Sequence, residues 1–128
     1  MKNINLKSKN SIENKLPSNI EAEQALIGSI LVNNDIIDEI SNLLKAEKFF
    51  DPVHKKIFKV IETLNNKGMI ANPITLKNYF ENLNELDEVG GAEYLVKLTR
   101  FASSSKQATD YAKIVHENFV KRELLEIS

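Results

Sequence analysis

The feature that most constrains this chain is the segment Ile20–Val32, which has helical character and is apolar around almost its whole circumference. After three polar side chains near its start, only Gly28 and Ser29 interrupt the apolar residues. At about 3.6 residues per turn, such a helix presents no face that suits water, so protein must surround it. A glycine near its centre lets a second helix approach closely. The segment therefore predicts the central helix of a small helical domain.

The composition fits one cytoplasmic domain without membrane contact. The 128 residues include 17 basic side chains, 18 acidic side chains and no cysteine. A core of this size can offset its own ordering entropy without disulfides or a metal, and a chain without cysteine is compatible with a reducing compartment. The net charge of -1 argues against a dedicated nucleic-acid surface, which usually carries a basic excess. No apolar run approaches the roughly 20 residues that span a bilayer, and no apolar signal-peptide segment follows the first lysines.

Residues 1–17 are expected to form a flexible basic tail. They are rich in Lys, Asn and Ser and hold only isolated apolar side chains. Such a segment cannot bury enough apolar area to order itself. Two interpretations remain open: a solvated tail, which the general behaviour of termini favours, or an arm that touches DNA or an acidic partner.

Helical periodicity continues through residues 18–102, and no alternation of period two is long enough to predict a strand. Apolar side chains recur at helical spacing within Ile36–Leu44, Val53–Leu64, Leu76–Leu83 and Ala92–Leu98. We therefore expect an all-α fold, with a compact globular head of about five to six helices over residues 18–102. A long C-terminal helix follows over residues 103–128.

Capping residues mark where these helices begin and end. Asp51 is a strong N-cap and Pro52 suits the first helical position, where its missing N–H would be unpaired. Other helix starts are predicted at Ser18 or Asn19, at Asn34 and at Thr75, and Ser104 with Gln107 is predicted to form a capping box. Gly68 is predicted to end a helix, and Gly90 and Gly91 lie in a predicted turn.

The last predicted helix changes its apolar face along its length. Its first half carries one stripe, from Ala108 to Phe119, that can pack on the head. Beyond that point the apolar positions lie on other sides of the helix, and one packing surface cannot cover them all. The residues concerned are Val120, Leu124, Leu125 and Ile127. We interpret them as an interface with a following helix or another subunit, although a fraying helix end is the alternative.

No motif indicates catalysis, a bound cofactor or a metal. A phosphate-binding loop needs a Gly-Lys-Ser/Thr sequence that none of the four glycines provides. His54 and His116 lack neighbours at metal-ligand spacing, and His54 is interpreted as a hydrogen-bonded core histidine. Glu21 and Glu23 point to different sides of their helix, and their place in its first turn fits dipole compensation. We therefore expect no enzymatic activity in this fragment.

Five short motifs follow one another along the chain. They are Glu21–Gln24 with Gly28, Phe49–Phe50 with His54, Ile74–Leu76, Val89–Gly91 with Tyr94, and Tyr111–Val115 with Arg122. Each motif alone is weak, but their order and spacing are specific. Over most of residues 17–127 the chain resembles the N-terminal domain of the DnaB family of bacterial replicative helicases.

The resemblance implies a non-catalytic collar with a helical head and a helical hairpin. Residues 103–128 would be the first arm of that hairpin, truncated before the second arm. Pairs of hairpins would dimerise the domains within a ring-shaped hexamer, and the collar would dock the C-terminal domain of primase and affect how a helicase loader engages. ATP and Mg²⁺ would serve a separate motor domain, with no cofactor in this fragment. Asn72 stands where the family commonly has an acidic residue, so no role of that carboxylate carries over.

Two other functions fit parts of the sequence. One is a stand-alone helical adaptor, such as the helicase-binding domain of primase, which has a similar helical head by family analogy. The other is a small DNA-binding domain that uses the lysine-rich tail, which the near-zero net charge disfavours. An ATPase domain in the natural protein would distinguish the collar from the adaptor.

Overall fold

The computed structural model describes residues 16–127, and for Ile127 the backbone alone. Most of the predicted tail therefore lies outside the described residues. Within that range the regular elements are α2 (Ile20–Val32), α3 (Asp35–Ile40), η1 (Ala46–Lys48), α4 (Pro52–Asn66), α5 (Pro73–Asn82), η2 (Asp87–Val89), α6 (Gly91–Thr99) and α7 (Ser105–Ile127). This confirms the predicted all-α fold, with a helical head followed by a long C-terminal helix.

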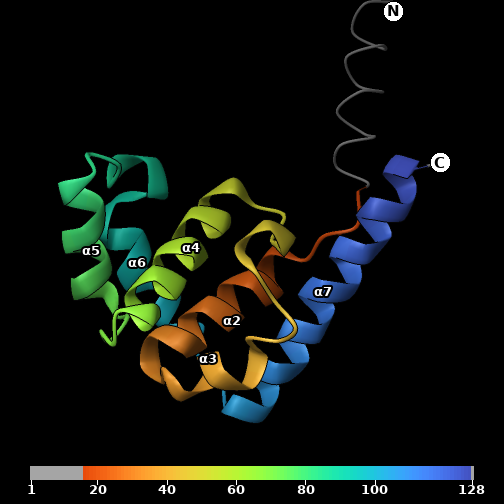
Figure 1. The fold of residues 1–128 in the computed structure, drawn as a ribbon, viewed down its shortest axis with the longest axis horizontal. Helices are drawn as coiled ribbons and strands as arrows, with labels where there is room; N and C mark the ends of the chain where they lie inside the picture. Colours follow the sequence, from red (N-terminus) through yellow and green to blue (C-terminus); the bar gives the residue numbers. More distant parts are fainter. Residues whose placement is uncertain (1–15, 128) are drawn as a thin grey trace, which may run out of the picture.

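Helix α2 lies at the centre of the domain, in contact with α3, α4, α6 and α7. Figure 1 shows α4, α5 and α6 on one side of α2 and α7 along the other, with the C-terminal end of α7 projecting past the rest of the head. The apolar circumference of α2 explains this arrangement, because each of its faces needs a helix to cover it.

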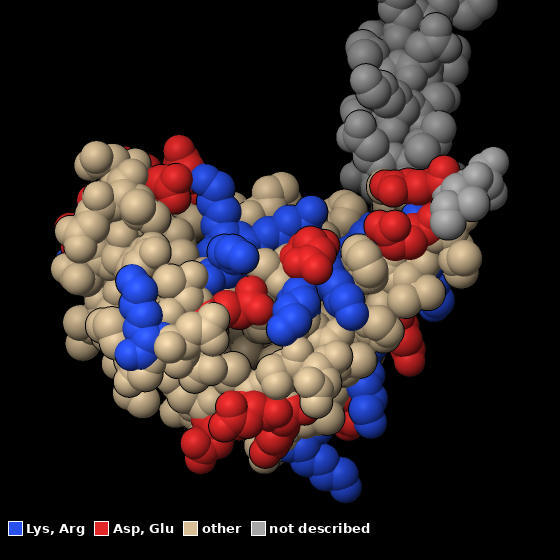
Figure 2. Space-filling view, viewed as in Figure 1, with Lys and Arg blue, Asp and Glu red and all other residues tan. Residues whose placement is uncertain are grey.

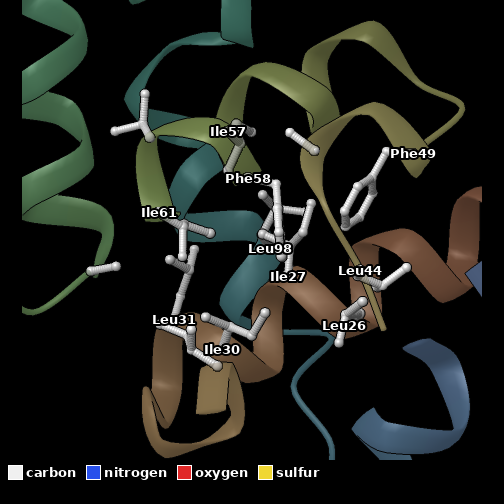
Figure 3. Close-up of a cluster of buried hydrophobic side chains, with 14 of the residues drawn as sticks. Leu26, Ile27, Ile30, Leu31, Leu44, Phe49, Ile57, Phe58, Ile61 and Leu98 are labelled. Carbon is white, nitrogen blue, oxygen red and sulfur yellow. The ribbon is translucent and has the colours of Figure 1, made fainter. Parts of the chain in front are cut away.

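The core forms where α2 meets α4, α6 and the segment that connects α3 to α4 (Figure 3). Its labelled members are buried side chains: Leu26, Ile27, Ile30, Leu31, Leu44, Phe49, Ile57, Phe58, Ile61 and Leu98. Burying one such side chain contributes about 1.5–3 kcal/mol.

The apolar side chains of α2 are not all buried, and the exposed one is the last residue of the helix. Val32 is 64% exposed, because the helix ends there at the edge of the core.

Gly28 lies where α2 and the C-terminal end of α6 approach most closely. A Cβ atom at this position would be 1.9 Å from the carbonyl oxygen of Leu98 and 2.9 Å from its carbonyl carbon. Both atoms belong to the backbone, so no side-chain rotation could relieve the overlap. The close approach predicted from the glycine is therefore present, and α6 is the helix that uses it.

Three of the predicted helix starts are capped as expected. The side chain of Asn19 accepts a hydrogen bond from the Ala22 N–H, and that of Asp51 accepts one from the Val53 N–H. Pro52 occupies the first turn of α4. At the start of α7 the Ser104 hydroxyl accepts a hydrogen bond from the Gln107 N–H, which is one half of the predicted capping box. The Gln107 side chain accepts from the Ser104 hydroxyl, in place of the Ser104 N–H that the motif requires.

Two predicted caps are wrong. Helix α3 begins directly after Asn34, as predicted, but the Asn34 side chain makes no capping hydrogen bond. Its side chain instead donates to the carbonyl oxygens of Ile30 and Ala71 and accepts from the Ala71 N–H, which ties α2 to the segment before α5. Thr75, the predicted N-cap of α5, is instead the third residue of that helix. Asn72 caps the helix, and the Thr75 hydroxyl accepts from the Asn72 N–H. Asn and Thr are both good caps, so residue type alone does not distinguish these positions.

Candidate functional site: a buried polar network and an exposed helix face

Glu23 is a buried hydrogen-bond acceptor at the centre of the domain. The residue is 1% exposed, and its carboxylate accepts from the Phe50 N–H at 2.7 Å and from the Asp51 N–H at 3.3 Å. Its third partner is the Nδ1 atom of His54, at 2.8 Å. Dipole compensation, predicted for both glutamates, therefore does not account for the contacts of Glu23. Glu21 is exposed in the first turn of α2, where a carboxylate interacts favourably with the helix dipole.

His54 connects Glu23 to Tyr94. Its Nδ1 atom faces the Glu23 carboxylate, and its Nε2 atom lies 2.6 Å from the Tyr94 hydroxyl. A neutral ring with its proton on Nδ1 satisfies both contacts, donating to the carboxylate and accepting from the hydroxyl. The Tyr94 oxygen also accepts from the side chain of Gln24 at 3.2 Å. No buried side-chain nitrogen or oxygen lacks a partner among the residues described.

This network holds helices together. It connects the first turn of α2 to the start of α4 and to α6, and His54 itself is fully buried. A buried charge is tolerated only where it is paired and hydrogen-bonded, as Glu23 is. Elsewhere in residues 16–127, no group of three His, Cys, Asp or Glu side chains is placed to hold a metal ion.

The alkaline stability of the domain should depend on Tyr94. Burial raises the pKa of Tyr94 above its usual value, and the nearby Asp51 and Glu23 carboxylates act in the same direction. The folded state therefore holds the phenolic proton more tightly than the unfolded chain. This contribution is complete below about pH 10 and is lost as the pH rises through the higher folded-state pKa. Urea denaturation at pH values from about 9 to 11 should show a steeper loss of stability in the wild type than in Tyr94→Phe. Equal slopes would contradict the prediction.

Arg122 fastens the second half of α7 to the head. One guanidinium nitrogen, Nη1, donates to the Pro17 carbonyl at 2.7 Å, and Nη2 donates to the Lys48 carbonyl at 2.9 Å. The guanidinium carbon lies 5.2 Å from the centre of the Phe50 ring, a cation–π distance. Partial burial lowers the pKa of Arg122, although the group remains charged at neutral pH.

The predicted interface residues lie on both sides of Arg122, on the projecting end of α7. Val120 is 40% exposed, Leu124 is 62% exposed and Leu125 is 53% exposed. Ile127 belongs to α7, but its side chain lies outside the described residues. Val120 and Leu124 are four residues apart and so share one side of the helix. We refer to these two residues as the distal α7 face; their role as an interface stays a prediction.

The predicted structural residues occupy special backbone positions. Gly90 and Gly91 adopt positive φ angles of 91° and 75°, between η2 and α6. A side chain at either position would be strained.

The polar network also contains residues that the sequence analysis did not assign to it, namely Glu23, Gln24 and Tyr94. One signal was present: Glu23 shares a helix face with Ile27 and Ile30, and a carboxylate on a buried face requires a buried partner.

Comparisons with known proteins agree on one family. Residues 15–117 match the family described as DnaB-like helicase N terminal domain. The replicative DNA helicase DnaB of Rickettsia felis is 43% identical over 112 residues, which cover 88% of this chain and 23% of that protein. The same helicase from Buchnera aphidicola is 34% identical and covers 100% of this chain and 28% of that protein. The chain thus spans about a quarter of the length of the curated relatives it matches.

Two solved structures share the fold. The N-terminal domain of DnaB helicase from Mycobacterium tuberculosis superposes with a TM-score of 0.83 at 29% identity, over 88% of this chain and 81% of that one. A DnaB-like replicative helicase, described together with its interactions with primase, gives a TM-score of 0.76 at 29% identity. That match covers 85% of this chain and 26% of the other.

Proposed function

Because this chain belongs to the DnaB-like helicase N-terminal domain family, we propose that it is the non-catalytic collar of a replicative DNA helicase. In this role it assembles with further copies of itself into the hexameric ring and docks the C-terminal domain of primase during replication. The parent protein is then a cytoplasmic, ATP-dependent DNA-unwinding enzyme. Its ATP and Mg²⁺ sites belong to a separate motor domain, and a helicase loader is a further partner.

The distal α7 face carries the assembly part of this proposal. Val120 and Leu124 are exposed apolar side chains at the end of a helix whose first half is packed on α2. Exposed apolar residues at such a position favour contact with another protein surface. The remaining support comes from the relatives, which are named replicative helicases, and from the solved helicase whose interactions with primase are described.

The alternative, a stand-alone adaptor or a helicase-binding domain of primase, has less support. The two curated relatives described above carry the name of the helicase, and the chain aligns with about a quarter of their length. Direct DNA binding by the head is also disfavoured, since the net charge is -1. Within residues 16–127, no helix is both long and apolar enough to cross a bilayer.

Lysine at both positions of the distal α7 face should weaken self-association. In sedimentation equilibrium, Val120→Lys combined with Leu124→Lys should raise the dimer dissociation constant at least about tenfold. Placing two cations in an apolar contact costs more than the roughly 1.5 kcal/mol gained by burying one such side chain. The matched control is Val32→Lys with Ile74→Lys, two apolar residues that are 64% and 78% exposed elsewhere on the surface.

Two results would count against the assembly proposal. One is a wild-type chain that stays monomeric at its highest soluble concentration, and the other is an equal loss of association in the control pair. Primase docking is tested separately, by calorimetric titration with the C-terminal domain of a bacterial primase. No heat of binding to the wild-type domain would remove that part of the proposal.

A further inference from the structure

A shallow groove of about 550 Å³ runs along the exposed side of α4, bordered by η1 and α5. Its apolar lining includes Val60 from α4 and Tyr79 and Leu83 from the C-terminal part of α5 and its cap. Within this lining Leu83 is 49% exposed, Tyr79 is half-buried and Val60 is buried. The groove lies on the head, in elements other than α7, so it is separate from the distal α7 face.

Two lysines on the rim of this groove have no charged partner. Lys55 and Lys59 are exposed and one helical turn apart, and neither ammonium group has a hydrogen bond or ion pair within residues 16–127. Lys56, between them, differs because it pairs with Glu88 and lies 4.0 Å from Glu85. Figure 2 shows Lys and Arg side chains gathered over the position of α4, with acidic side chains beside them. The groove thus combines a small apolar patch, formed by exposed Leu83 and half-buried Tyr79, with two positive charges that have no ion-pair partner in the described part of the chain.

We propose that this groove binds an acidic amphipathic helical segment of a partner protein. Apolar side chains of the segment pack on Leu83, Tyr79 and Val60, and two of its carboxylates, one turn apart, pair with Lys55 and Lys59. Carboxylates at that spacing lie on one face of a helix, as the two lysines do on α4. The inference goes beyond the collar function, since it adds a second docking surface of different chemistry.

The groove is unsuited to nucleic acid. Glu47 and Glu85 line it and would repel a phosphate backbone. Among the lining residues Tyr79 is the only aromatic ring that is not fully buried, which leaves a single surface for base stacking. An acidic peptide can avoid the two carboxylates because its charges are localised on individual side chains.

The test measures the binding of a synthetic helical peptide to the whole 128-residue chain by fluorescence anisotropy. The peptide carries leucines on one face and two glutamates, one turn apart, beside them. A scrambled peptide of the same composition and a single-stranded oligodeoxythymidylate serve as the other probes. Binding should be confined to the amphipathic peptide, and NMR shifts should concentrate on α4 and α5.

Charge reversal at Lys55 and Lys59 to Glu should weaken peptide binding by about tenfold, because two attractive pairs become repulsive. The matched control reverses Lys106 and Lys113, exposed lysines on the first part of α7, which changes the net charge equally. Equal losses in the two variants, or equal binding of the scrambled peptide, would overturn the proposal. So would tighter binding of the oligonucleotide that depends on Lys55 and Lys59. Sedimentation of the same variants separates this result from self-association through α7.

Discussion

Replacing Gly28 with alanine should destabilise the domain, although the same change stabilises most helices. Alanine is favoured over glycine inside a helix by about 1 kcal/mol. Here, however, the added Cβ would lie 1.9 Å from the Leu98 carbonyl oxygen, so α2 and α6 must move apart. Such overpacking typically costs about 1–3 kcal/mol, and backbone contacts place this position at the upper end. The sign of the effect therefore tests the helix–helix contact directly.

Urea denaturation followed by circular dichroism measures this change. Gly68→Ala is the control, because a Cβ there meets no atom within 4 Å and the only cost is its positive φ angle of 74°. That cost is about 1–2 kcal/mol. If Gly28→Ala were as stable as the wild type, the approach of α6 to α2 would be wrong. Gly28→Leu should be more destabilised than Gly28→Ala.

The second large effect is expected at Glu23. Replacement with alanine removes the acceptor for the Phe50 N–H, the Asp51 N–H and the His54 ring. All three donors lie where solvent cannot easily replace the carboxylate, since Glu23 is 1% exposed and His54 is fully buried. Breaking a buried pair by removing one partner costs about 3–5 kcal/mol. This is a large share of the roughly 5–15 kcal/mol that stabilises a domain.

Glu21 provides a matched control for Glu23. It lies in the same helical turn but is exposed, so Glu21→Ala removes only its interaction with the helix dipole. That interaction is worth about 0.3–1 kcal/mol. A double-mutant cycle of Glu23→Ala with His54→Ala should show strong coupling between the two sites. Similar midpoints for the two glutamate variants would contradict a buried role for Glu23.

The sequence predicts the framework of this fold because its signals are local. The periodicity of α2, the Asp51–Pro52 start of α4 and the Ser104 cap of α7 each depend on residues within one or two turns. Gly28 was also informative, since a glycine within an apolar helix has few explanations besides close packing.

The polar network could not be derived in the same way, because its members are distant in the chain. Glu23 and His54 are separated by 31 positions, and His54 and Tyr94 by 40. Periodicity shows that Glu23 lies on a buried face but does not identify its partner. Asn34 shows a related limit: its side chain bonds to Ala71, 37 positions away, in place of the local cap that its residue type predicts. Long-range contacts compete with local ones, and only the packed structure decides between them.

The two hydrogen bonds of the Arg122 guanidinium affect which positions can vary among sequences of this fold. Both of its acceptors are main-chain oxygens, at Pro17 and Lys48, and every residue type supplies such an oxygen. Substitutions at those two positions therefore leave the contact intact, whereas at position 122 only arginine offers a planar fork with several donors. The Arg122 contact alone therefore restricts position 122 and not positions 17 and 48, although the Lys48 side chain has separate contacts with the Leu43 carbonyl and His116. Correlated substitution between positions would then not reveal this contact, although it fastens the far half of α7 to the head.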